Sequence, residues 1–322
     1  MKKTIFILSI VLIFVTGCAQ EIEKPIAEEK IEATTTTIQE TTTTTTIKEK
    51  VKLWKNRGVA IAGKYADAEI TDLGNERYRV YYSPEPETSG FKGQVYSAVS
   101  SDGINWNQEE GTRMEWATFP SVIKLPDGKY RMYSQNQVVI KSAISNDGLS
   151  WKEESGIRIG TSNSAGLKLS SVLAPTVIKN GNEYIMVYAG AINEKYPEKV
   201  PNNEIHLFLW ATSTDGLTFE EKGIALDSRN DEFKGWLDGA EFTQWDDGSI
   251  RLYFWSYKGI YHITYKNGIF SKDAVFDYTT NDNPLNQFPE NPPSDPTLAK
   301  INNRWFMYYG QHKKGIYYAV LE

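Results

Sequence analysis

A repeated β-hairpin constrains the fold more than any other feature of the sequence. Residues 101–106, 146–151 and 214–219 each contain an Asp-Gly pair with Trp or Phe three residues after the glycine. Alternating small and apolar residues precede each pair, and a glycine with a second alternating run follows it. Because Asp-Gly readily adopts the positive φ angles of a tight turn between antiparallel strands, each segment predicts a hairpin.

A second hairpin precedes each of these segments. It is clearest at residues 121–133, recurs at 176–188 and 241–253, and has looser copies at 69–81 and 297–308. Together the hairpins make five copies of a four-stranded antiparallel unit, and no part of this region has a helical period. Repeated four-stranded units predict an all-β fold, a five-bladed β-propeller.

The fifth unit has no fourth strand of its own. Residues 315–322 supply its third strand, whereas residues 53–61 carry the fourth-strand pattern of an aromatic residue, a polar stretch, a glycine and alternating apolar residues. We therefore expect residues 53–61 to pair with the C-terminal strand. This pairing closes the ring and removes an exposed sheet edge.

The region before the repeats has the composition of an export signal followed by a linker. Two lysines precede an apolar run at residues 5–15, which is too short to span a bilayer. The run leads into Val15, Thr16, Gly17 and Cys18, which resemble the lipobox of lipoprotein signal peptides. The resemblance implies lipidation of Cys18, and an ordinary signal peptide with a chance cysteine is the alternative.

Three regions follow from this pattern. We expect residues 1–17 to be a lipoprotein signal peptide, residues 18–50 a disordered linker rich in Thr and Glu, and residues 51–322 the propeller domain. The protein is then extracytoplasmic and lipid-anchored to the cell membrane or the outer membrane.

Composition excludes several classes of function. The net charge of −6 disfavours nucleic acid as a partner. One cysteine excludes a disulfide scaffold and a cysteine zinc site, and three histidines leave little for a histidine-rich metal centre. We expect no cofactor, with a structural calcium in the channel as the open alternative, and a monomer.

Aligning the five copies places columns of residues where the innermost strands begin, at the channel of a propeller. The first column is Asp67, Phe119, Ala174, Gly239 and Asp295, and the third is Glu69, Ser121, Thr176, Glu241 and Thr297. Because side chains alternate along a strand, these two columns are expected to share one face. Four carboxylates then converge on the channel, and Asp238 lies just above them.

Several carboxylates around one channel suit glycoside hydrolysis. One acid must be protonated to assist the leaving group, and another must be ionised to activate water or to attack. Crowded like charges raise the pKa of one of them and prepare this difference. The alternative is that these acids accept hydrogen bonds from backbone amides or bind a cation.

The repeats also carry a resemblance to known proteins. The five units, the strand start at Asp295, Pro296 and Thr297, and the Ser-x-Asp-Gly-x-x-Trp hairpins resemble five-bladed propeller glycosidases, namely arabinanases and xylosidases, invertases and levansucrases. The resemblance implies that Asp67 is the base or nucleophile and Glu241 the acid. Phe119 and Ala174 stand where a middle-blade aspartate belongs, and Asp295 is the substitute for it.

The Asp-Gly hairpins also resemble the Asp-boxes of sialidases. In this interpretation the three aspartates, Asp102, Asp147 and Asp215, stabilise turns far from the channel. The aromatic residues that follow them, Trp106, Trp151 and Phe219, are then expected to pack between blades. No arginine triad that would grip a sialic acid carboxylate is present in the pattern.

Substrate contacts are expected from the channel and its rim. The predicted substrate-binding residues are Glu69, Trp116, Phe119, Ser121, Thr176, Trp236 and Asp238. Long connections at residues 189–203, 227–239 and 277–294 carry further aromatic residues that either stack on sugars or cap the blades. His206 and His262 are expected to be packed within third strands, whereas His312 lies on a loop that could approach the channel.

Two classes of function remain open at this point. The first is a surface-anchored, carbohydrate-active lipoprotein, a glycoside hydrolase acting on an extracellular oligo- or polysaccharide. The second is a non-catalytic propeller lipoprotein that binds a glycan or a protein. A propeller fold by itself does not decide between them.

Overall fold

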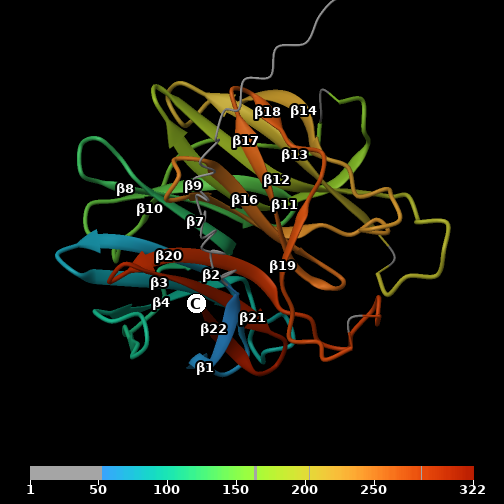
Figure 1. The fold of residues 1–322 in the computed structure, drawn as a ribbon. Coiled ribbons are helices and arrows are strands. Elements are labelled where there is room, and N and C mark those ends of the chain that lie inside the picture. Colours follow the sequence, from blue (N-terminus) through green and yellow to red (C-terminus); the bar gives the residue numbers. More distant parts are fainter. Residues whose placement is uncertain (1–52, 163–164, 203, 284) are drawn as a thin grey trace, which may run out of the picture. The chain divides into compact units, whose positions relative to one another are not determined.

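The computed structural model describes residues 53–322 apart from 163–164, 203 and 284. The predicted signal peptide, the lipidation site Cys18 and the whole of the predicted linker therefore lie outside the described residues. The described residues contain strands and no helix (Figure 1). Consequently, none of them forms a helix long and apolar enough to cross a membrane.

The strands form five antiparallel sheets, which are the blades of a propeller. Blade one consists of β2 (Tyr65–Gly74), β3 (Arg77–Pro84), β4 (Gln94–Ser100), β5 (Asn107–Gln108) and β6 (Met114–Glu115). Blade two consists of β7 (Thr118–Lys124), β8 (Tyr130–Asn136), β9 (Val139–Ser145) and β10 (Lys152–Glu153). Blade three consists of β11 (Leu169–Asn180), β12 (Glu183–Ile192), β13 (Ile205–Ser213) and β14 (Glu220–Leu226).

The remaining strands make the last two blades. Blade four consists of β15 (Asp238–Gln244), β16 (Ile250–Ser256), β17 (Gly259–Lys266), β18 (Ile269–Phe270) and β19 (Val275–Tyr278). Blade five consists of β20 (Ser294–Ile301), β21 (Arg304–Gln311), β22 (Gly315–Leu321) and β1 (Trp54–Ala62). In blades one and four, two short strands share the outer position, because β5 and β6 both pair with β4, and β18 and β19 both pair with β17. The predicted all-β five-bladed propeller is confirmed.

The ring is closed by the two ends of the described chain. β1 pairs antiparallel with β22, so that Trp54 lies opposite Leu321 and Ala62 opposite Gly315. Figure 1 shows the blue β1 beside the dark red β22. The predicted closure of the last blade by an N-terminal strand is therefore confirmed.

The core lies between the blades. Five clusters of buried apolar side chains occur, and each joins two neighbouring blades around the ring. In four blades a tyrosine of the second strand, opposite the third-column residue, is fully buried in these clusters: Tyr81, Tyr133, Tyr253 and Tyr308. Val187, also fully buried, takes this position in blade three. Burial of large aromatic side chains at every interface stabilises the ring, because each contributes a large apolar area.

The Asp-Gly turns connect neighbouring blades. In the turn of blade two, the carboxylate of Asp147 accepts hydrogen bonds from the amides of Leu149 and Ser150 at 2.8 and 2.9 Å. Arg79 and Tyr81 of blade one donate to the carbonyl oxygens of this turn, and Trp151 packs edge-on against Tyr81. Asp215 and Asp102 accept the equivalent amide hydrogen bonds, with Phe219 packed against Tyr133 and Trp106 against Tyr308. Of these two turns, among the described residues, only the one at Asp215 also accepts a hydrogen bond from an arginine, Arg131. The predicted turn-stabilising role of these aspartates is confirmed.

Candidate active site

Each innermost strand has a β-bulge at the same place. The first-column residue adopts a left-handed backbone in all five blades, with φ of 54° at Asp67, 49° at Phe119, 46° at Ala174, 55° at Gly239 and 46° at Asp295. The strand register shifts at each of these positions. Regular alternation along a strand predicts that the first and third columns share one face, but in the structure this bulge sets where the side chains point.

Residues at the starts of the innermost strands line one small central cavity with a volume of about 20 Å³. Its lining consists of the first column, of Glu69 and Glu241 from the third column, and of the residues between the two columns: Ala68, Pro120, Pro175, Ala240 and Pro296. A volume of this size holds about one water molecule. The cavity is thus too small for a sugar, and any larger ligand must approach from a mouth of the channel.

Wider hollows lie at both mouths and divide the carboxylates into two levels. At one mouth, Asp67 lines a hollow of about 470 Å³ and Asp295 an adjoining one of about 430 Å³. These two hollows share a wall made of Ala66, Glu85 and Pro86. At the other mouth, Glu69 and Glu241 line a hollow of about 560 Å³. The acids that the sequence places in one channel therefore open to different mouths.

Third-column side chains join each blade to the next. Glu69 accepts a hydrogen bond from the amide of Val122 at 2.7 Å, and Ser121 accepts one from Val177 at 3.1 Å. Thr176 likewise bonds the amide of Phe242 at 3.0 Å, and Thr297 bonds that of Ile70 at 3.1 Å. These contacts match the alternative in which residues at the strand starts accept hydrogen bonds from backbone amides. The substrate-binding roles of Glu69, Ser121 and Thr176 stay predictions.

Glu241 and Glu69 form a coupled acid pair at this level. The hydroxyls of Thr176 and Thr297 lie 3.3 and 3.4 Å from the carboxylate oxygens of Glu241. Burial raises the pKa of Glu241 to about 7. Burial and the neighbouring charge of Glu241 raise the pKa of Glu69 well above its usual range. The pair therefore retains a proton near neutral pH.

Asp67 and Asp295 form the acid pair at the opposite level. Asp295 accepts a hydrogen bond from the indole of Trp255 at 2.9 Å, and the amide of Phe119 donates to Asp67 at 3.4 Å. Burial, and then the charge of Asp238, raise the pKa of Asp295 to about 7. Burial and the charge of Asp295 raise the pKa of Asp67 well above its usual range.

Gly239 makes room for Asp295. A Cβ atom on Gly239 would lie 2.2 Å from Oδ1 of Asp295 and 2.7 Å from its Cα. The other four first-column residues carry side chains at a similar φ, so the backbone angle alone does not demand glycine here. The close approach of Asp295 is what requires glycine at position 239.

Asp238 is a buried neighbour of the acid pair and affects the pKa values of Asp67 and Asp295. It is 6% exposed, and its Oδ1 accepts a hydrogen bond from the amide of Gly239 at 2.9 Å. Its Oδ2 lies 3.7 Å from Nδ1 of His206. Asp238 does not line either of the two adjoining hollows, so it acts on Asp67 and Asp295 through its charge.

Aromatic side chains line the hollows at the Asp67 and Asp295 mouth. Trp116, which is 54% exposed, and Phe119 line the Asp67 hollow. Trp236, Trp255 and Tyr257 line the Asp295 hollow, where the rings of Trp236 and Tyr257 stack with centroids 6.3 Å apart. The structure thus brings Trp116, Phe119 and Trp236 to the mouth where the sequence expects them.

Other predicted residues have structural surroundings. Of the aromatic residues on long connections, Phe233 and Tyr278 are buried in the core, whereas Phe288 packs against Tyr257. His206 and His262 are buried in the third strands β13 and β17, as predicted. His312 lies at the wall of the Asp295 hollow.

The sequence reading missed Trp255, Tyr257 and Glu85. A signal was present, because the second strand of a blade runs antiparallel to the first and ends beside its start. Trp255 pairs with Asp238 in this way. The residues of the second strands that lie opposite the starts of the first strands therefore form a fourth column: Ser83, Gln135, Ala189, Trp255 and Gly310.

The fold and the site define a five-bladed β-propeller with a channel lined by carboxylates. No known family profile matches the chain, and no curated protein matches it. Solved structures do. A thermostable family-43 glycoside hydrolase is 16% identical with a TM-score of 0.58, covering 84% of this chain and 92% of its own.

Two further neighbours have the same architecture. A glycosyl hydrolase from Bacteroides ovatus is 16% identical with a TM-score of 0.57, covering 80% of this chain and 84% of its own. A glycoside hydrolase of family 130, which targets β-1,2-mannosidic linkages in Candida mannan, is 14% identical with a TM-score of 0.58, covering the same shares. At these identities the likeness establishes the fold.

Proposed function

We propose that this chain is a carbohydrate-active propeller that cleaves glycosidic bonds at the mouth lined by Asp67 and Asp295. One observation carries the proposal: two half-buried carboxylates with raised pKa values face adjoining hollows with aromatic walls. Glycoside hydrolysis requires one protonated and one ionised carboxyl group at the scissile bond. The fold that the neighbours share supports the same class of chemistry.

The coupled pair supplies both the acid and the base. With a pKa of about 7, Asp295 loses its proton near neutral pH, and the resulting charge favours retention of the proton on Asp67. The hydrogen bond from Trp255 fixes the orientation of the Asp295 carboxylate. Near neutral pH the pair therefore holds one proton that can be donated and one negative charge that can activate water.

The hollows suit sugar rings. Each has a volume within the range of about 300–1,000 Å³ that is usual for small-molecule sites. The apolar faces of a sugar can stack on Trp236 and Trp255 while its hydroxyls reach the carboxylates. The exposed Trp116 offers a second stacking surface on the other side of Asp67.

The experiment is a screen of aryl glycosides and polysaccharides for release of reducing sugar. Asp67→Asn and Asp295→Asn should each abolish turnover on a substrate that the unmodified chain cleaves. Glu241→Gln is the informative comparison, because Glu241 opens to the other mouth and should be dispensable. Turnover lost only in Glu241→Gln would instead support the assignment of Glu241 as the acid.

The second candidate is a propeller that binds a glycan without cleaving it. The specific observation is that blades two and three place Phe119 and Ala174 at the first column, so that the acids come from one side of the ring only. Binding of a polysaccharide in a sedimentation or calorimetric assay, with no sugar released in the full screen, favours this candidate.

Attachment to a membrane is part of the proposal. Its support is the sequence from Val15 to Cys18 and the Thr-rich stretch that follows. Cys18→Ser should move the protein from the membrane fraction to the soluble fraction and abolish labelling by a fatty-acid analogue. Unchanged fractionation and labelling would refute the lipid anchor.

A further inference from the structure

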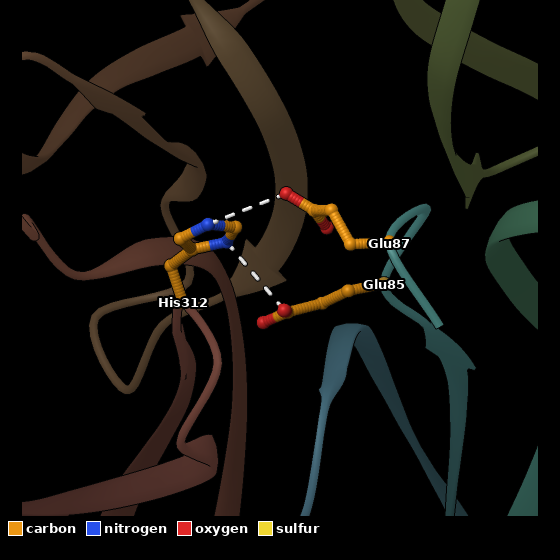
Figure 2. Close-up of side chains that lie close together, drawn as sticks. All are labelled: Glu85, Glu87 and His312. Atoms are coloured by element: carbon orange, nitrogen blue, oxygen red, sulfur yellow. Dashed lines mark ion pairs between the residues drawn. The ribbon is translucent and has the colours of Figure 1, made fainter. Parts of the chain in front are cut away.

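Three metal-ligating side chains meet at the rim of the two adjoining hollows. Glu85 and Glu87 follow β3 in blade one, and His312 lies in the turn between β21 and β22 in blade five. Figure 2 shows the imidazole between the two carboxylates, with Nδ1 3.5 Å from Oε2 of Glu85 and Nε2 3.5 Å from Oε1 of Glu87. One ligand atom from each residue lies within 4.8 Å of the others.

Glu85 is buried and incompletely partnered. It is 3% exposed, and its Oε1 accepts a hydrogen bond from the amide of Lys313 at 2.6 Å. Its Oε2, which faces His312, receives no hydrogen bond. Within the described part of the chain, neither Glu85 nor Glu87 forms an ion pair with lysine or arginine. A buried carboxylate without such compensation is costly, so the site favours a cationic ligand.

The backbone around the cluster is held in place. The side chain of Asn291 accepts a hydrogen bond from the amide of His312 at 3.1 Å and donates one to its carbonyl at 3.2 Å. Lys313 has a φ of 64°, which turns its amide toward Glu85. The side chains of His312 and Glu87 are 53% and 48% exposed, so both can adjust around a ligand while the turn stays fixed.

We propose that Glu85, Glu87 and His312 bind a divalent first-row transition metal ion, for which zinc is the probe. Imidazole and carboxylate together are typical ligands of such ions, whereas calcium prefers oxygen ligands alone. Two ligands of a tetrahedral zinc, each about 2.0–2.2 Å from the metal, lie about 3.3–3.5 Å apart, which matches the observed spacing of Glu85 and His312.

The ion would join blade one to blade five. Because a metal binds a single imidazole nitrogen, the exposed Glu87 turns toward the nitrogen that Glu85 already faces. Water completes the coordination. Glu85 and His312 line the same hollow as Asp295, but the metal site uses none of the residues proposed for glycoside cleavage. Either proposal can therefore fail without the other.

The test is calorimetric titration of zinc chloride into the chelator-treated full chain. We expect one ion per chain and a melting temperature that rises with zinc concentration, since a ligand that binds only the folded state stabilises it. His312→Asn, at an exposed position, should weaken binding at least tenfold and remove the rise. Glu85→Gln should act in the same direction. Glu290→Gln, an exposed acid in the same hollow, is the matched control and should bind normally.

Two results would overturn the proposal. The first is the absence of zinc binding, or binding of equal affinity in His312→Asn and the unmodified chain. The second is a zinc anomalous-scattering peak at another position, such as His206, with none between Glu85 and His312. A peak within about 2.0–2.2 Å of both residues supports it.

Discussion

Replacement of Asp295 by asparagine should stabilise the propeller at alkaline pH and leave it nearly unchanged at acidic pH. The carboxyl group of Asp295 has a pKa of about 7 in the folded protein against an ordinary value of 3.8, because the surrounding protein desolvates it and the charge of Asp238 lies near. Between these two pH values the folded state holds a proton that the unfolded state has released. The free energy of unfolding contributed by this group is therefore fully present below pH 3.8 and falls as the pH rises toward 7.

The size of the effect follows from the shift. About three pKa units at about 1.4 kcal/mol each correspond to a loss of at most about 4 kcal/mol across this pH window. Asparagine has nearly the same shape, keeps an acceptor for the indole of Trp255 and never ionises. Its substitution also removes the charge that raises the pKa of Asp67, which lessens the alkaline loss further.

The assay is urea unfolding of both chains at pH 4, 6 and 8. The variant minus parent difference in unfolding free energy should grow with pH to several kcal/mol. Asp147→Asn is the control with the opposite sign, because the amides of Ser150 and Leu149 lower the pKa of Asp147. Its contribution is present above the usual aspartate pKa and is lost as the pH falls. Parallel curves for Asp295→Asn and the parent would refute the raised pKa.

Three further predictions concern how the ring is held together. Thr297→Val leaves the buried amide of Ile70 without an acceptor and should cost about 1–3 kcal/mol in urea unfolding; an unchanged midpoint would contradict it. Gly239→Ala should lower the free energy of unfolding by about 1–3 kcal/mol, because the added Cβ displaces Asp295. The loss should exceed that of Gly248→Ala, since Gly248 also has a positive φ but a Cβ there would meet no atom within 4 Å. Equal losses in the two glycine variants would show that backbone strain is the cause instead. Deletion of β1 removes the strand that pairs with β22 and should lower the melting temperature of the whole domain by calorimetry, and an unaltered melting curve would contradict the closure.

Local patterns in the sequence were sufficient to predict the architecture. Asp-Gly turns at fixed offsets and period-two alternation specify hairpins through interactions between residues close in the chain. Five repeated four-stranded units then predict a ring of five blades. Even the closure by β1 was predictable, because the strand that the fifth blade lacked had a recognisable pattern elsewhere in the chain. The turn role of Asp147 followed for the same reason, since its partners are two and three residues away.

The candidate site depended on tertiary structure. Four of the five first-column residues adopt a left-handed backbone without being glycine, and the sequence carries no signal for this. The resulting bulge, rather than strand alternation, determines that Asp67 and Asp295 open to one mouth while Glu69 and Glu241 open to the other.

Contacts between blades determine the features of the site that the sequence did not predict. The sequence alone identified a propeller with acids near its channel, because strand period and turn chemistry are local properties. The raised pKa of Asp295, the indole that orients it and the meeting of Glu85 with His312 arise only in the folded ring. Burial and distance are properties of packed neighbours, and these neighbours come from blades that lie far apart along the chain.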